Sequence, residues 1–211
     1  MLGEMSFGGS LSAKLIKGAK EAPLSWKLKN IARWGFIKGW IYWHLAWAFS
    51  RLTEIPTLVS SLSIRVRKAD GKWIDYGTVC YRVVTDAGVA FIVDDMDSSA
   101  TDITTLNYHG VGTGVTAEAA AQTALVTEST TVLNPDSTRA TGTKSQPSAN
   151  VLRSVGTVTF DGSAAITEHG IFSQAATGGG TLLDRSLFAA INVAAADSIQ
   201  FTYDLTFTSG G

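Results

Sequence analysis

The spacing of apolar residues changes once along this chain, close to Pro56. From Leu24 to Leu52 apolar residues recur at every third or fourth position, which is the period of an α-helix. Two stripes share this segment, one through Leu24, Leu28, Ile31, Ile37, Ile41, Leu45, Ala48 and Leu52 and the other through Phe36, Trp40, Trp43 and Trp47. The helix is apolar nearly all round, and Pro56 marks its end. The pattern predicts a helical arm over residues 1–56.

The start of this arm follows a different pattern. Glycines at positions 3, 8 and 9 predict a flexible beginning. Leu11, Leu15 and Ile16 then alternate with lysines, which predicts a short basic amphipathic turn or helix that ends at Pro23.

After residue 56 the period becomes two, as in half-buried β-strands. Leu58–Arg67 alternates in this way, Asp70-Gly71 predicts a hairpin turn, and the partner strand extends to Val84. Further strands are predicted at Val89–Val93, Ile103–His109, Ala124–Leu133, Thr138–Lys144, Val151–Phe160, Ala165–Phe172, Leu182–Val193 and Ser198–Phe207. Short strands without repeated β–α units indicate a mainly β protein. We expect an antiparallel β-sandwich or jelly-roll-like body over residues 57–211.

The formal net charge of −1 is a cancellation between two oppositely charged regions. Residues 1–72 hold twelve Lys and Arg against four acids, a net of +8, whereas residues 73–211 hold five against fourteen, a net of −9. Five of the six tryptophans also lie between Trp26 and Trp47. Opposite charges within one chain indicate interaction surfaces. We expect the arm to bind a partner or the acidic body of a neighbouring copy, which predicts salt-sensitive oligomers.

Several roles for the arm can be compared. A membrane span is disfavoured because the apolar run is too short and contains Lys38, and an export signal fits poorly. An interfacial membrane helix stays open as a lesser alternative. Nucleic-acid stacking is disfavoured because the tryptophans belong to a helix rather than to a sheet. Docking onto a protein is favoured, and the candidate contact residues are Arg33, Trp34, Phe36, Lys38, Trp40, Trp43, Trp47 and Phe49.

The side chains that carry most enzyme chemistry are sparse. Cys80 is the single cysteine, which excludes a disulfide framework, and its context predicts a buried thiol in a strand. Of the three histidines, His44 lies in the apolar helix, and His169 alternates with Glu168 along a strand, so those two point to opposite faces. No Gly-x-Ser-x-Gly elbow is present. A Ser-His-Asp set assembled across the fold stays open, but the sequence favours a protein without enzymatic activity.

Three further segments predict loops rather than ligand sites. Asp94, Asp95 and Asp97 lack the spacing of a calcium-binding loop. Gly178–Gly180 lacks the Lys-Thr pair of a phosphate-binding loop. The glycines of Tyr108–Gly114 are typical of a structural loop. We therefore expect neither a metal nor a cofactor.

The body resembles a group of small virion proteins encoded by tailed bacteriophages and prophages. The resemblance covers about Ile64 to Gly211 and rests on three segments: LNYHGVGTGVTAEAAAQTALVTE (Leu106–Glu128), STRATGTKSQPSANVLRSVGTVTF (Ser137–Phe160) and AITEHGIFSQAATGGGTLLDRSLFAAINVAAADSIQFTYDLTFTSGG (Ala165–Gly211). The third segment is the most specific. The helix WGFIKGWIYWHLAWAF also looks like the leader of some marine and cyanobacterial phage versions. The resemblance implies membership of a virion and carries over no catalytic residues.

The expected function is that of a head decoration or cement protein, which binds the major capsid protein and stabilises neighbouring capsomers. Such a protein is assembled into the virion in the bacterial cytoplasm. A homo-oligomer is expected, with a trimer favoured because shells offer many threefold positions. Neither nucleic acid nor a membrane is an expected partner. The alternatives are a tail-, neck- or fibre-associated or host-binding protein and, more remotely, a membrane-interacting factor that uses the Trp-rich helix.

Overall fold

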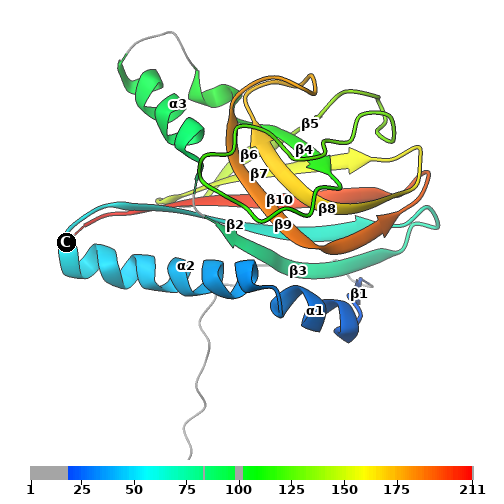
Figure 1. The fold of residues 1–211 in the computed structure, drawn as a ribbon, viewed down its shortest axis with the longest axis horizontal. Helices are drawn as coiled ribbons and strands as arrows, with labels where there is room; N and C mark the ends of the chain where they lie inside the picture. The colour runs from blue at the N-terminus through cyan, green and yellow to red at the C-terminus, as the bar shows by residue number, and fades with distance from the viewer. Residues whose placement is uncertain (1–18, 83, 98–101, 211) are drawn as a thin grey trace, which may run out of the picture.

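Two β-sheets pack against each other in the computed structural model, which describes residues 19–82, 84–97 and 102–210 (Figure 1). The first sheet has the strand order β1-β3-β2-β10-β7-β6, and the second has the order β5-β4-β8-β9. The strands are β1 (Lys20–Glu21), β2 (Thr57–Arg67), β3 (Trp73–Arg82), β4 (Tyr108–Gly112), β5 (Ala140–Thr141), β6 (Thr143–Ser148), β7 (Val151–Thr159), β8 (Ala164–Phe172), β9 (Leu182–Val193) and β10 (Ser198–Thr208). All strand pairs are antiparallel except β1 with β3. The predicted mainly β sandwich is confirmed.

Strand β10 shows how the alternating pattern builds the core. It pairs with β2 on one side and β7 on the other along most of its length. Ile199, Phe201, Tyr203 and Leu205 are buried between the sheets, whereas the intervening side chains are partly exposed. Side chains from both sheets, such as Ile64 of β2 and Phe188 of β9, belong to the same apolar cluster. The period of two therefore predicts both the strand and its buried face.

The hairpin and several strand positions also agree with the sequence. Lys68–Lys72 connects β2 to β3, and Gly71 has φ +82°, a conformation that glycine adopts without steric cost. Strands β7, β8 and β10 lie within one residue of their predicted bounds, and β9 has the predicted bounds.

The prediction of a strand at Val89–Val93 is wrong, because these residues belong to helix α3 (Asp86–Asp97). Thr85 precedes this helix, and its hydroxyl accepts a hydrogen bond from the backbone N–H of Gly88 at 3.0 Å. This is an N-cap, which satisfies a donor that the first helical turn leaves free. Asp86 in the first turn adds a favourable charge. Asp94, Asp95 and Asp97, predicted to form a turn, lie in the last part of α3.

Four other predictions need correction. Ala124–Leu133 is not a strand: it makes only isolated bridges from Glu128 and Leu133. Tyr108–Gly114, predicted as a loop, contributes β4 through Gly112. The start of the predicted strand Ile103–His109 is a single 3-10 turn, η1 (Ile103–Thr105). Thr138–Lys144 divides between β5 and β6.

The helical part of the arm consists of two helices, α1 (Leu24–Ile31) and α2 (Trp34–Thr53), separated by Ala32 and Arg33. Arg33 has an extended backbone, so the chain changes direction there. In Figure 1 both helices lie along one side of the sandwich, and α3 lies on the other. The flexible start and the basic helix predicted before Pro23 fall mainly on residues 1–18, outside the described part of the chain.

Candidate interaction surface on the helical arm

Helix α2 contacts the sandwich through its smallest residues. Gly39 lies against β3: a Cβ built there would be 2.0 Å from the carbonyl oxygen of Tyr81. Ser50 is fully buried, and its hydroxyl oxygen lies 2.9 Å from the carbonyl oxygens of both Ile55 and Ser209, which share its single proton. Because these positions are small, the helix axis approaches the sheet closely.

Two aromatic side chains complete this inner side of α2. The ring centres of Phe36 and Trp43 lie 5.8 Å and 5.6 Å, respectively, from the ring centre of Tyr81. Both side chains are half-buried. Of the eight predicted contact residues, these two therefore contact mainly the protein's own sandwich and not an external partner.

Arg33, between α1 and α2, also faces the body. Its Nη1 is buried without a hydrogen-bond partner among the described residues. Burial lowers the pKa of this guanidinium, and the nearby Glu118 carboxylate counteracts the shift. The side chain of Arg33 is thus partly buried against the sandwich and only partly available to an external partner.

The outer side of α2 carries large apolar side chains that contact water. Trp34 is 73% exposed, Trp47 60%, Phe49 50% and Trp40 41%. Lys38 is exposed beside them, with its Nζ 5.6 Å from the centre of the Tyr42 ring. We define the outer arm face as the exposed apolar residues of α1 and α2 and their flanking bases: Leu24, Leu28, Lys29, Ile31, Trp34, Lys38, Trp40, Ile41, Tyr42, Leu45, Trp47, Phe49, Arg51 and Leu52.

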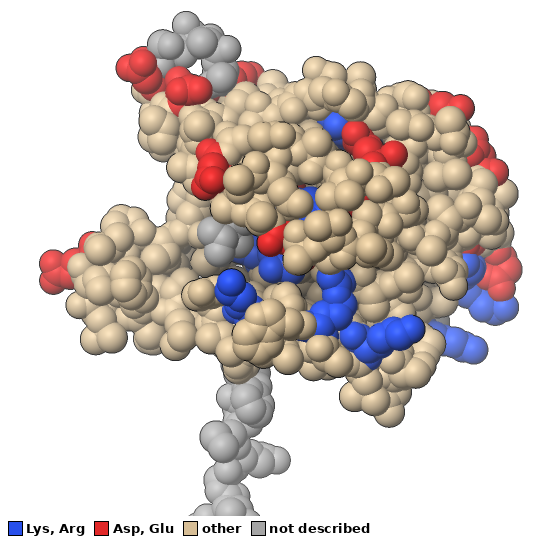
Figure 2. All heavy atoms as spheres, in the orientation of Figure 1, with Lys and Arg blue, Asp and Glu red and all other residues tan. Residues whose placement is uncertain are grey.

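A shallow hollow of about 280 Å³ lies on this face, between Trp34, Lys38, Ile41 and Tyr42. Its lining is mainly apolar, with one cation at the rim. Basic side chains are numerous on the arm: residues 19–56 contain six Lys and Arg and two acids. In Figure 2 blue side chains gather over the lower side of the molecule, where α1 and the start of α2 lie, and red ones lie around α3 and also along the upper right edge of the body.

Helix α1 is held by two residues that sequence reasoning missed as anchors. The amide of Asn30 donates to the carbonyl of Val79 in β3 and accepts from the N–H of Ala189 in β9, both at 2.9 Å. The indole N–H of Trp26 donates to Ala190 at 2.9 Å. Asn30 thus joins β3 of the first sheet to β9, an edge strand of the second. In the sequence, Asn30 is recognisable only as a polar residue next to the apolar Ile31. This pattern does not reveal hydrogen-bond partners as distant in the chain as Val79 and Ala189.

The sandwich interior holds the histidines that could have formed a catalytic set. His109 lies between His169 and Ser154: its Nδ1 is 3.0 Å from His169 Nε2, and its Nε2 is 2.8 Å from Ser154 Oγ. Ser154 in turn donates to Oδ1 of Asn107 at 2.7 Å. Because the serine proton is used there, its oxygen accepts from His109. The imidazole is therefore a donor to Ser154 and not a base that activates it.

Burial also argues for a structural role of this network. Both imidazoles are fully buried, and His169 stacks on Phe201 with ring centres 4.4 Å apart. Burial lowers the pKa of His109 to about 3 and, with the neighbouring His109, also lowers the pKa of His169. Gly156 leaves room for the ring, since a Cβ there would be 2.4 Å from His109 Cδ2.

Buried carboxylates hold the irregular segments in place. Glu168 pairs with Arg185 at 2.7 Å and accepts from the N–H groups of Gly114, Val126 and Thr127. These bonds explain why the predicted strand at Ala124–Leu133 does not form: its early N–H groups bind a side chain instead of a neighbouring strand. Cys80 is buried, as predicted, and burial raises the pKa of its thiol.

Asp184 is a second buried carboxylate, fully enclosed between the sheets. It accepts hydrogen bonds from the hydroxyls of Ser60 and Ser186. Burial raises its pKa to about 6, against the opposing effect of those two hydrogen bonds.

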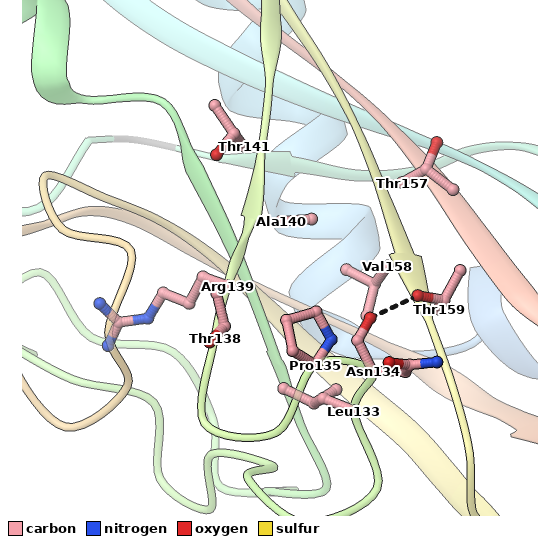
Figure 3. A pocket seen from close by; sticks show the side chains of 10 residues that line it. All are labelled: Leu133, Asn134, Pro135, Thr138, Arg139, Ala140, Thr141, Thr157, Val158 and Thr159. Carbon is pink, nitrogen blue, oxygen red and sulfur yellow. Dashed lines mark hydrogen bonds between the residues drawn. The ribbon is translucent and has the colours of Figure 1, made fainter.

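A second hollow, of about 250 Å³, is shown in Figure 3. Threonines from β5, β7 and the preceding loop line it together with Asn134 and Pro135. The guanidinium of Arg139 points away from it and binds Glu128 at 2.6 Å. Among the described residues, the lining of this hollow therefore consists of hydroxyl, amide and apolar groups, and its one guanidinium points away.

Within residues 19–82, 84–97 and 102–210, no group of three or more His, Cys, Asp or Glu could hold a metal ion. Among the helices described, none combines the length and the apolarity needed to cross a bilayer.

Comparisons with known proteins add no relative. No protein-family description, no curated protein and no solved structure matches this chain.

Proposed function

We propose that this protein is a structural component of a tailed-bacteriophage virion, and specifically a decoration or cement protein that binds the major capsid protein. The resemblance of Leu106–Glu128, Ser137–Phe160 and Ala165–Gly211 to phage virion proteins supports the virion assignment. In this role the sandwich is a rigid body, and the arm links it to the shell and stabilises neighbouring capsomers.

The observation that carries the proposal is the orientation of α2. The helix turns Gly39 and Ser50 toward its own body and leaves Trp34, Trp47 and Phe49 exposed on its other sides. Large contiguous apolar patches are uncommon on monomers and mark binding sites. Tryptophan is also among the residues that most often dominate the energy of a protein interface. The arm therefore has the chemistry of a docking element that is held in place by the sandwich.

The test is incorporation into particles. In a W47S/F49S variant the outer arm face loses two anchors, whereas the contacts of α2 with its own body remain. We expect the number of copies per particle to fall by at least about tenfold, since two interface aromatics contribute roughly 2 kcal/mol or more. Quantitative mass spectrometry of purified particles measures the ratio to the major capsid protein.

A matched control keeps this test specific. Val115 and Val126 are exposed apolar residues of the body, and a V115S/V126S variant should be incorporated as the wild type is. Equal incorporation of W47S/F49S and the wild type would overturn the docking role of the arm. A wild-type ratio of only a few copies per particle would instead assign the protein to the tail or neck.

A further inference from the structure

Helix α3 presents a second exposed face, which differs in charge from the arm. Val89, Val93 and Met96 are spaced as neighbours on one side of the helix, and Met96 is 78% exposed. Asp86, Asp94 and Asp97 are exposed on the same helix, which contains no basic residue. We call Asp86, Val89, Val93, Asp94, Met96 and Asp97 the α3 face.

The inner side of α3 is committed to the sandwich. Gly88 and Ile92 are buried, and a Cβ at Gly88 would lie 2.7 Å from the carbonyl oxygen of Leu183. Asp95 accepts from the N–H of Ile103 at 3.0 Å. The α3 face is therefore held at a fixed orientation, and its exposure does not result from a loosely attached helix.

The two faces are complementary. The α3 face carries three acids and no base, and the outer arm face carries three bases, Lys29, Lys38 and Arg51, and no acid, so the formal charges are −3 and +3. Both faces combine apolar side chains with these charges. In Figure 1 they lie on different sides of the sandwich, so α3 does not cover the arm of its own chain.

We propose that the α3 face of one copy binds the N-terminal half of the outer arm face of a second copy. In this contact the flexible side chain of Met96 enters the hollow between Trp34, Ile41 and Tyr42. Asp94 and Asp97 then face Lys38 and Lys29. The C-terminal half of the outer arm face, around Trp47 and Phe49, remains available for the capsid.

The contact is heterologous, since it joins two different surfaces. Such contacts repeat from copy to copy and form rings where the rotation closes. Helix α3 is only about 18 Å long, so the contact is smaller than the roughly 800 Å² per partner of a standard stable interface. We expect weak, salt-sensitive association in solution that is strengthened when the shell presents many copies side by side. The inference thus deepens the proposed function by naming a second partner of the arm.

Sedimentation velocity of the full chain, without capsids, tests the contact. At about 0.05 M salt the wild type should associate as its concentration is raised, and at about 0.5 M salt it should remain monomeric. The variants D94K/D97K and K29E/K38E should each associate about tenfold more weakly, because each places like charges opposite each other. A variant M96S should also weaken association.

Mixing the two charge variants tests whether a wild-type α3 face and a wild-type arm on different copies are sufficient for the contact. D94K/D97K retains a wild-type arm and K29E/K38E retains a wild-type α3 face, so their mixture should associate again. The control R67E/K72E changes the net charge by the same amount as K29E/K38E, at the β2–β3 hairpin, and should associate as the wild type does.

A wild type that is monomeric at every concentration would overturn the inference, as would charge variants that associate normally or a mixture that does not. Flotation of the monomeric wild type with anionic phospholipid vesicles would assign the arm to a lipid surface instead. Because capsids are absent from this experiment, its failure leaves the incorporation test of the proposed function unaffected.

Discussion

The sandwich interior and the outer arm face distribute polar and apolar side chains in opposite ways. Inside the sandwich, His109, His169 and Glu168 are fully buried. On the arm, Trp34 and Trp47 are mostly exposed. His109 and Glu168 bind partners within the chain through hydrogen bonds or an ion pair, and of these three side chains only His169 has a ring nitrogen, Nδ1, without a hydrogen-bond partner among the described residues. The tryptophans, in contrast, turn most of their apolar surface to water. The comparison indicates that the body is complete as a folded unit, while the arm has a surface that binding would complete.

The largest expected effect is the loss of Arg185. An R185M variant leaves the fully buried Glu168 carboxylate without its cation, and removal of one partner of a buried pair costs roughly 3–5 kcal/mol. Chemical denaturation should show this loss in the free energy of unfolding. The double variant R185M/E168Q should recover part of it, because the remaining neutral amide needs no counter-charge. A single variant as stable as the wild type would contradict the role given to this pair.

A smaller effect concerns pH and the two histidines. The pKa of His109 is lower in the folded state than the ordinary value of 6.5, so the unfolded chain binds more protons below that pH. Its contribution to stability is therefore complete above pH 6.5 and is lost as the pH falls toward 3, by about 3 kcal/mol at pH 4. The difference between the unfolding free energies of the wild type and H109Q should therefore change by about 3 kcal/mol between pH 7 and pH 4.

Because Asp184 also titrates in this pH range, the difference in unfolding free energy between the wild type and H109Q is more informative than the wild-type pH dependence alone. Its raised pKa of about 6 gives the opposite sign, so its contribution is present at low pH and is lost as the pH rises from 3.8 through 6. The two contributions partly cancel in the wild type. Parallel pH curves for the wild type and H109Q would show that His109 is not held neutral by burial.

The smallest expected effect is on the stability of a variant in the outer arm face, and it tests the contrast between this face and the sandwich interior. The W47S/F49S variant should unfold within about 0.5 kcal/mol of the wild type, because exposed side chains contribute little to the folded monomer. Thermal unfolding measures this directly. A large loss of stability would mean that these side chains pack against the body, and the outer arm face would then be part of the fold and not a binding surface.

Local patterns were sufficient where neighbouring residues decide the structure. The alternation in Ser198–Phe207 and the Asp70-Gly71 turn predicted β10 and the first hairpin, because side-chain period and turn conformation are local properties. The pattern failed at Val89–Val93, where a capping threonine and close packing of Gly88 on β9 favour a helix. It failed again at Ala124–Leu133, where the N–H groups bind the distant Glu168.

For the candidate site, the helical arm, its concentration of tryptophan and its positive charge all follow from the sequence. Which side of α2 faces outward depends on how the helix packs against the sandwich. An almost uniformly apolar helix contains no local preference for one side, and the choice comes from Gly39 and Ser50, whose small size permits close approach to β3 and to the end of the chain. Likewise, only the fold placed an acidic helix on the side of the sandwich away from the basic arm.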